Sequence, residues 1–170
     1  MKRLIPIIIG TLVFSGCSGN PISKTRNLDS SFTAEAKISV GAESFSGRLS
    51  RISENNWELI ITEPFALEGL TAVIDENGTR LKMLGMEASA DFSDSALSAV
   101  KLISDAFDSA VKNTVTDLVS TGTNENGSYT LILSEDGYPS EINLPEFGIS
   151  VTVSEWEEIT ETGDDEAKIE

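Results

Sequence analysis

Apolar and polar residues alternate along most of the chain, and this period of two is the feature that most limits its fold. Phe32, Ala34, Ala36, Ile38 and Val40 fall on one face of an extended segment, and polar side chains fall on the other. Such alternation is typical of a strand with one buried face. Further strands are predicted over residues 45–52, 57–62, 67–74, 80–84, 87–92, 115–121, 128–134, 140–144 and 149–153.

Short polar segments separate these predicted strands. Residues 53–56 form one such turn, and residues 75–78 form another that ends in Asn77-Gly78. Asn-Gly is a strong hairpin signal because both residues tolerate a positive φ. Connections this short join antiparallel neighbours, so the strands are expected to form an antiparallel sheet.

One segment, residues 94–112, has the period of a helix instead. Its apolar residues, among them Leu97, Val100, Ile103 and Phe107, recur at spacings of three and four. Asp105, Asp108 and other polar residues occupy much of the other side, so one amphipathic helix is predicted, with Ser93 or Asp94 as its N-cap. The fold class is therefore mainly β (α+β), with about ten short strands and one central helix.

The N-terminus has the pattern of a bacterial lipoprotein signal. Lys2 and Arg3 precede an apolar run over residues 4–14, and Ser15-Gly16 then lead to Cys17, the only cysteine. The run is too short for a membrane-spanning helix of about 20 residues and fits a secretory signal. Two alternatives stay open: an ordinary signal peptide cut elsewhere, and a buried structural cysteine.

The preferred interpretation divides the chain into four parts and predicts its location in the cell. Residues 1–16 are a signal removed before Cys17, residues 17–30 are a lipidated cysteine and flexible tether, residues 31–154 are one domain, and residues 155–170 are an acidic, disordered tail. A diacylglyceryl group on the Cys17 thiol would hold the chain on the extracytoplasmic face of the cell membrane, or on the outer membrane of a host that has one.

The charge of the chain excludes one class of partner. The formal net charge is −16, and removal of Lys2 and Arg3 makes it −18. So acidic a surface repels nucleic-acid phosphates, and we expect a soluble, monomeric domain that binds no nucleic acid.

Residue types that usually carry catalysis are scarce. The sequence contains no histidine, which removes the commonest general base and neutral metal ligand. No glycine-rich phosphate loop and no twelve-residue calcium loop is present. We therefore expect no metal, no cofactor and no enzymatic activity, although an enzyme that uses carboxylates alone is a third hypothesis.

One stretch resembles a known family. It comprises Phe45-Ser-Gly-Arg-Leu-Ser50, then Trp57-Glu-Leu-Ile-Ile61 with Pro64, and then Gly69-Leu70. This pattern is similar to the bacterial lipoprotein-carrier superfamily, the LolA/LolB-like proteins, over roughly residues 32–112. The resemblance implies a strongly curved antiparallel sheet, a half-open β-barrel whose concave face is covered by the helix, with acyl chains held between the two.

The resemblance also implies site residues and a function. Phe65 or Leu67, after Pro64, would be a membrane-facing loop residue, although a core role is an equal alternative. The implied function is a membrane-anchored lipoprotein that binds or carries a lipid or an acylated protein. The alternative is a non-catalytic scaffold lipoprotein in which the cavity candidates form a filled core. Those candidates are Phe45, Leu49, Trp57, Leu59, Leu70, Leu97, Val100, Ile103 and Phe107.

Overall fold

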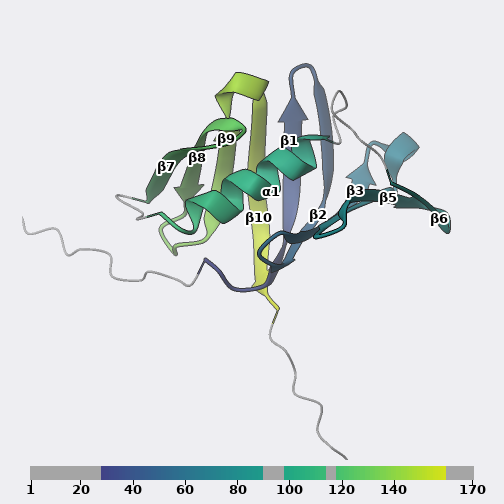
Figure 1. The fold of residues 1–170 in the computed structure, drawn as a ribbon, viewed down its shortest axis with the longest axis horizontal. Coiled ribbons are helices and arrows are strands. Elements are labelled where there is room, and N and C mark those ends of the chain that lie inside the picture. The colour runs from purple at the N-terminus through teal and green to yellow at the C-terminus, as the bar shows by residue number, and fades with distance from the viewer. Residues whose placement is uncertain (1–27, 90–97, 114–117, 160–170) are drawn as a thin grey trace, which may run out of the picture.

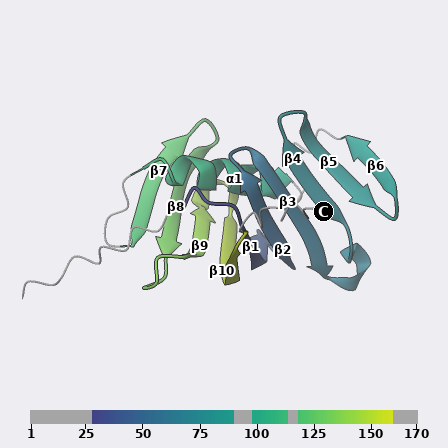
Figure 2. The same cartoon turned by 90° about the horizontal axis from the view of Figure 1, so that it is seen from below.

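Ten antiparallel strands form one open, curved sheet. The structure, a computed structural model, describes residues 28–89, 98–113 and 118–159. The strand order is β6-β5-β4-β3-β2-β1-β10-β9-β8-β7, and β6 and β7 are the unpaired edges of the sheet (Figure 2). The strands are β1 (Phe32–Val40), β2 (Glu43–Ser53), β3 (Asn56–Glu63), β4 (Thr71–Asp75), β5 (Gly78–Met83), β6 (Met86–Ser89), β7 (Val119–Asn124), β8 (Gly127–Leu133), β9 (Pro139–Leu144) and β10 (Ile149–Glu158).

A single described helix, α1 (Ser98–Ala110), crosses the strands on one face of the sheet (Figure 1). Ala99, Ala106 and Ala110 are buried together with the larger apolar residues of its inner face. These short side chains let the helix axis approach the sheet closely. The predicted fold class, a curved antiparallel sheet of about ten strands with one central helix, is confirmed.

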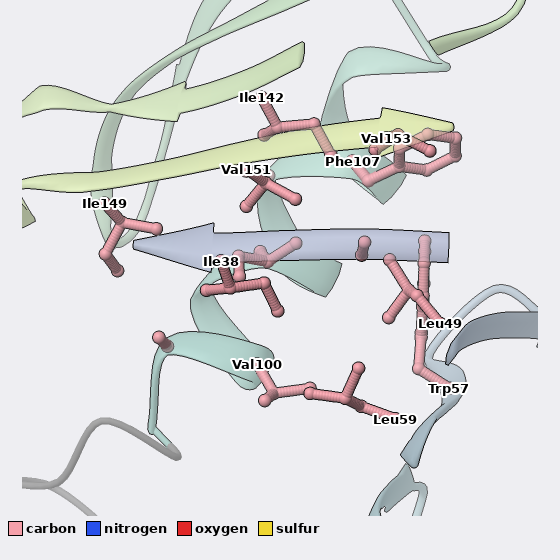
Figure 3. Close-up of a cluster of buried hydrophobic side chains, with 14 of the residues drawn as sticks. Ile38, Leu49, Trp57, Leu59, Val100, Phe107, Ile142, Ile149, Val151 and Val153 are labelled. Carbon is pink, nitrogen blue, oxygen red and sulfur yellow. The ribbon is translucent and has the colours of Figure 1, made fainter. Parts of the chain in front are cut away.

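The core lies between α1 and the inner face of the sheet. Phe32, Trp57 and Phe107 form its aromatic centre, with ring centroids 5.2–5.6 Å apart. Aromatic pairs in such geometry contribute about 0.5–1.5 kcal/mol each beyond the burial of their area. Aliphatic residues from β1, β2, β3, β9, β10 and α1 surround this centre (Figure 3).

The strand register defines two ends of the sheet, which we call the terminal end and, after the groove described in the next section, the groove end. At the terminal end lie the start of β1, the Glu54-Asn55 and Glu76-Asn77 turns, and Ile159, whose N–H donates to the Ser31 carbonyl at 2.9 Å. At the groove end lie the β3–β4 connection (residues 64–70) and the β5–β6 turn (residues 84–85). The described chain thus enters and leaves the sheet at the terminal end.

Several predicted boundaries are wrong. β7 ends at Asn124 rather than at residue 121, because residues 122–124 pair with β8. β4 begins at Thr71 rather than at residue 67, because Phe65–Leu67 form a short 3-10 helix, η1. β10 continues past residue 154 to Glu158, because its last residues pair with β1 and Trp156 stacks on Phe32 with ring centroids 3.6 Å apart. The first four residues of the predicted disordered tail therefore belong to the sheet.

Several predictions fall outside the described residues. These are the signal, Cys17, most of the tether, the caps at Ser93 and Asp94, Leu97, and the tail from residue 160. In the parts of the chain that are described, no helix has both the length and the apolar character needed to cross a membrane.

Candidate functional site

An apolar groove opens at the groove end of the sheet, where the start of β2 faces the end of β3. Its volume is about 420 Å³. Phe45, Ile61 and Leu67 supply most of the apolar wall, and Glu43 and Ser44 supply the polar rim. The lining residues are Glu43, Ser44, Phe45, Ile61, Pro64, Ala66 and Leu67.

The β3–β4 connection is held in place by its own backbone. The N–H of Leu67 donates to the Pro64 carbonyl at 2.8 Å, and the N–H of Leu70 donates to the Leu67 carbonyl at 2.9 Å. The N–H of Gly69, at φ +80°, donates to the Ile61 carbonyl at 2.9 Å. A single 3-10 turn fixed at both ends cannot bury all three of its side chains, and η1 has no buried residue.

Phe65 and Leu67 consequently remain outside the core. Phe65 is 89% exposed and Leu67 is 37% exposed. The core role that the sequence left open is therefore excluded for both residues. Leu67 borders the groove, and Phe65 lies in sequence between two lining residues, Pro64 and Ala66.

Gly47 lies at an irregularity in the pairing of β2 with β3, two residues from Phe45 of the groove. A Cβ on Gly47 would lie 2.3 Å from the Ile60 carbonyl oxygen, so a side chain there would push β2 away from β3. The register between these strands shifts at Ser46/Gly47, and such an irregularity bends and twists a strand. Gly47 belongs to the Phe45–Ser50 motif, and its close approach to β3 gives a physical reason for a glycine at this position of the motif.

The predicted cavity residues separate into two groups. Leu49, Trp57, Leu59, Val100, Ile103 and Phe107 are at most 2% exposed, and Leu70 is also buried. These side chains belong to the buried cluster between α1 and the sheet. Figure 3 shows Val100 of α1 beside Leu59 of β3 in this packing. Phe45 alone among the described candidates lines the groove.

A buried ion pair at the terminal end escaped the sequence analysis. Arg51 is fully buried, and its Nε donates to Asp108 Oδ1 at 2.8 Å. Asp108 Oδ2 also accepts from Trp57 Nε1 and from the Asn55 N–H, both at 2.9 Å. Arg51 Nη2 donates to Asp29 Oδ1 at 2.6 Å. The prediction that Asp108 lies on the polar side of the helix is therefore wrong.

The sequence contained a signal for this pair. Arg51 is in phase with Phe45 and Leu49 on the inward face of β2. A buried arginine requires a carboxylate partner, which the alternation alone could not locate because Asp108 is distant in sequence.

A polar hollow of about 300 Å³ lies between the Glu54-Asn55 turn, α1 and the end of β7. Its charges are largely paired within the protein, since Lys112 bonds to Glu54 and Asp108 to Arg51. The hydrogen bond that Lys112 donates to Glu54 raises the pKa of Lys112. No group of potential metal ligands occurs among the described residues. The pairing gives these side chains a structural role, so the apolar groove is the stronger candidate site.

The fold and groove together define a class: an open, curved antiparallel sheet around one helix, with an apolar groove at one end. No protein-family model matches the chain, and no curated protein matches it significantly. Among solved structures, the chain is similar to an uncharacterized conserved protein from Thermus thermophilus, with 15% identity over 79% of this chain and 82% of the other, at a TM-score of 0.46.

Two other solved structures are similar at 10% identity. One is a LolA superfamily protein from Nitrosomonas europaea, over 78% of this chain and 87% of the other, at a TM-score of 0.42. The other is a DUF1329 family protein from Desulfovibrio piger, over 84% and 90%, at a TM-score of 0.37. Likenesses this distant assign no function, which must come from the groove itself.

Proposed function

We propose that this chain is a membrane-anchored lipoprotein of the cell envelope that binds an acyl chain, of a lipid or of a lipidated protein, in the groove at Phe45, Ile61 and Leu67. The observation that carries the proposal is the apolar groove of about 420 Å³ lined by Phe45, Ile61 and Leu67. The site differs from the one expected between sheet and helix, where the candidate side chains pack against one another.

The size and walls of the groove support an apolar ligand. Its volume falls within the roughly 300–1,000 Å³ that small-ligand sites occupy. Each CH₂ group removed from water contributes about 0.8 kcal/mol, so a short length of acyl chain would bind measurably.

Binding rather than catalysis fits the residues present. The walls contain no histidine or cysteine, and Glu43 is the one carboxylate among the lining residues. The proposal therefore assigns no catalytic residue.

The ligand is tested with a fluorescent fatty acid and the full chain carrying Cys17→Ser. We expect saturable binding that Leu67→Ser weakens by about tenfold, because burial of one leucine is worth at least that factor. Ile60→Ser is the matched control, since Ile60 is also 37% exposed but lies on the outer face of β3. Equal loss in both variants, or no binding in the parent chain, would contradict the proposal.

The anchor is tested by intact mass spectrometry of the chain purified from membranes. We expect a mature protein that begins at Cys17 and carries an added diacylglyceryl group, and Cys17→Ser should abolish the addition. A mature chain with an unmodified thiol would sink the anchoring part of the proposal.

One observation favours a second function, a non-catalytic scaffold. The described cavity candidates all belong to the buried core cluster, and only Phe45 among them also borders the groove, as the scaffold hypothesis expects. In that case the exposed apolar loops would contact a protein partner, and no lipid would co-purify with the chain in native mass spectrometry.

A further inference from the structure

Two hairpins of the sheet share one sequence pattern. The β4–β5 turn is Asp75-Glu-Asn-Gly78, and the β7–β8 turn is Asn124-Glu-Asn-Gly127. In each turn the first residue pairs with the glycine, so Glu-Asn are the two central residues. The two turns can therefore be compared directly within one molecule.

The backbone of the two turns is also alike. The Asn77 N–H donates to Asp75 Oδ1 at 2.8 Å. In the same way, the Asn126 N–H donates to Asn124 Oδ1 at 2.9 Å. Side-chain acceptors in this position stabilise a turn locally. The glycine that follows has a positive φ in both turns, +104° and +127°. The two Asn-Gly bonds thus have the same local geometry.

An Asn-Gly bond allows a backbone nitrogen to attack a side-chain amide, because glycine has no Cβ to hinder that nitrogen. In the β4–β5 turn, the nitrogen of Gly78 would lose its proton and bond to Cγ of Asn77. The Cγ–Nδ2 bond breaks, and the amide leaves with that proton as ammonia. One water molecule from solvent then opens the succinimide ring: its hydroxyl joins either carbonyl carbon, and its hydrogen goes to the nitrogen. The products are aspartate or isoaspartate at residue 77.

The β7–β8 turn is tied to two other parts of the protein. Asn126 Nδ2 donates to Asp105 Oδ2 at 3.0 Å, which connects the turn to α1. Glu146, in the segment after β9, accepts from the Ser128 hydroxyl at 2.7 Å. The carboxylate of Glu146 also occupies the space in which a Cβ of Gly127 would lie. The asparagine side chain must therefore leave a carboxylate partner before its Cγ can be attacked.

The β4–β5 turn has no such ties within the described residues. Asn77 and Gly78 are both exposed, and a Cβ on Gly78 would point into open space. The backbone N–H of Asn77 and, to a smaller extent, its side-chain amide lower the pKa of Asp75. These contacts stay inside the turn, so they do not connect it to the helix or to another strand.

We propose that Asn77 is a site of spontaneous covalent modification, at which the folded chain converts to isoaspartate and aspartate. Asn126, in the matching turn, is protected from the same reaction by its bond to Asp105 and by the packing of Glu146. The proposal rests on the contrast between the two turns and does not depend on the acyl ligand or on the anchor.

The modification changes both the charge and the backbone of the turn. It adds a carboxylate beside Asp75 and Glu76, in a chain whose formal net charge is already −16. Isoaspartate also lengthens the backbone of residue 77 by one CH₂ group. The pair of Asp75 with Gly78, which closes the hairpin, cannot then keep its register. We expect the converted chain to unfold at a lower urea concentration than the parent chain.

Peptide mapping by mass spectrometry tests the proposal in the full chain carrying Cys17→Ser. The folded protein is incubated at mildly alkaline pH, and fragmentation of the peptides assigns the conversion to each asparagine. We expect Asn77 to convert at least about tenfold faster than Asn126, because a hydrogen bond to a charged group is worth at least that factor. Equal rates, or a faster conversion of Asn126, overturn the proposal.

The same measurement in urea separates the effect of structure from that of sequence. Both turns are lost in the unfolded chain, so the two Asn-Gly sequences should convert at similar rates. A difference that persists in urea would come from the flanking residues, Thr79 and Ser128 among them, and would overturn the proposal.

Asp105→Ala removes the acceptor that holds Asn126. We expect its conversion to rise by about tenfold, while that of Asn77 stays unchanged. Lys101→Ala is the matched control, because it removes the ion-pair partner of Asp105 and leaves the bond to Asn126 in place. No rise at Asn126, or an equal rise at both asparagines, overturns the proposal. If circular dichroism shows that Asp105→Ala does not fold, the parent chain with and without urea decides the question.

Discussion

The two ends of the sheet differ in how completely they pair their buried charges and bury their apolar side chains. At the terminal end, a fully buried arginine has carboxylate partners from the helix and from residue 29, and Trp57 donates its one N–H to the same network. At the groove end, Phe65, Leu84 and Met86 are left in solvent. Apolar groups gathered in solvent are uncommon on a monomer and mark interaction sites. We therefore expect substitutions at the terminal end to act mainly on stability, and substitutions at the groove end to act mainly on the binding proposed above.

The largest effect is expected from breaking the buried ion pair. Asp108→Ala leaves Arg51 buried without its helical partner and should lower the free energy of unfolding by about 3–5 kcal/mol. Glu54→Ala is the control, because its pair with Lys112 is exposed on both sides and such pairs are worth about 0–1 kcal/mol. Urea denaturation measures both. A similar small loss in the two variants would mean that the terminal end does not hold the helix to the sheet.

The second effect contrasts core with groove. Ile103→Ala removes buried methyl groups from the face of α1 and should cost about 2–5 kcal/mol while fatty-acid binding is retained. Phe65→Ser should change stability by no more than about 0.5 kcal/mol and should weaken fatty-acid binding. Stability and fatty-acid binding are measured in both variants. Reduced binding in Ile103→Ala, with binding unchanged in Phe65→Ser, would contradict the groove and favour a ligand site between the helix and the sheet.

The sequence predicted the strands well because alternation is a local property. The predicted and observed bounds of β1 coincide at Phe32 and Val40, and Pro64 correctly ends the third strand. The pattern also placed Phe45, Leu49, Trp57 and Leu59 on the inward face. It could not decide between cavity lining and packed core, since that depends on the volumes of side chains from several strands and the helix together.

The groove and the ion pair depend on contacts that no local pattern contains. The groove needs the start of β2 to meet the end of β3, and Gly47 lies close to the Ile60 carbonyl only after the strands have paired. The partner of Arg51 lies on a helix in the other half of the chain. Leu84, predicted as the last residue of the strand over residues 80–84, lies instead in the β5–β6 turn, because Met83 pairs with Met86.

The third effect tests how the groove end is shaped. Gly47→Ala puts a Cβ within 2.3 Å of the Ile60 carbonyl oxygen, and overpacking of this kind costs about 1–3 kcal/mol. The neighbouring Ser46→Ala, a change in the same strand that adds no atoms, is the control. We expect Gly47→Ala to lose both stability and fatty-acid affinity in denaturation and binding measurements. Unchanged affinity would show that the bend in β2 does not shape the groove.

The smallest effect concerns pH and the turn at the terminal end. The Asn77 N–H donates to Asp75 Oδ1 at 2.8 Å, and together with Arg80 it lowers the pKa of Asp75 below 3.8. A carboxyl group whose pKa is lower in the folded state stabilises the fold above its unfolded pKa, and that stability is lost as the pH falls through the folded value. Urea midpoints measured at neutral pH and near pH 3 should therefore fall less in Asp75→Asn than in the parent chain. Glu76→Gln, which removes the same charge from the next position, is the control, and an equal change in both variants would contradict the role of Asp75.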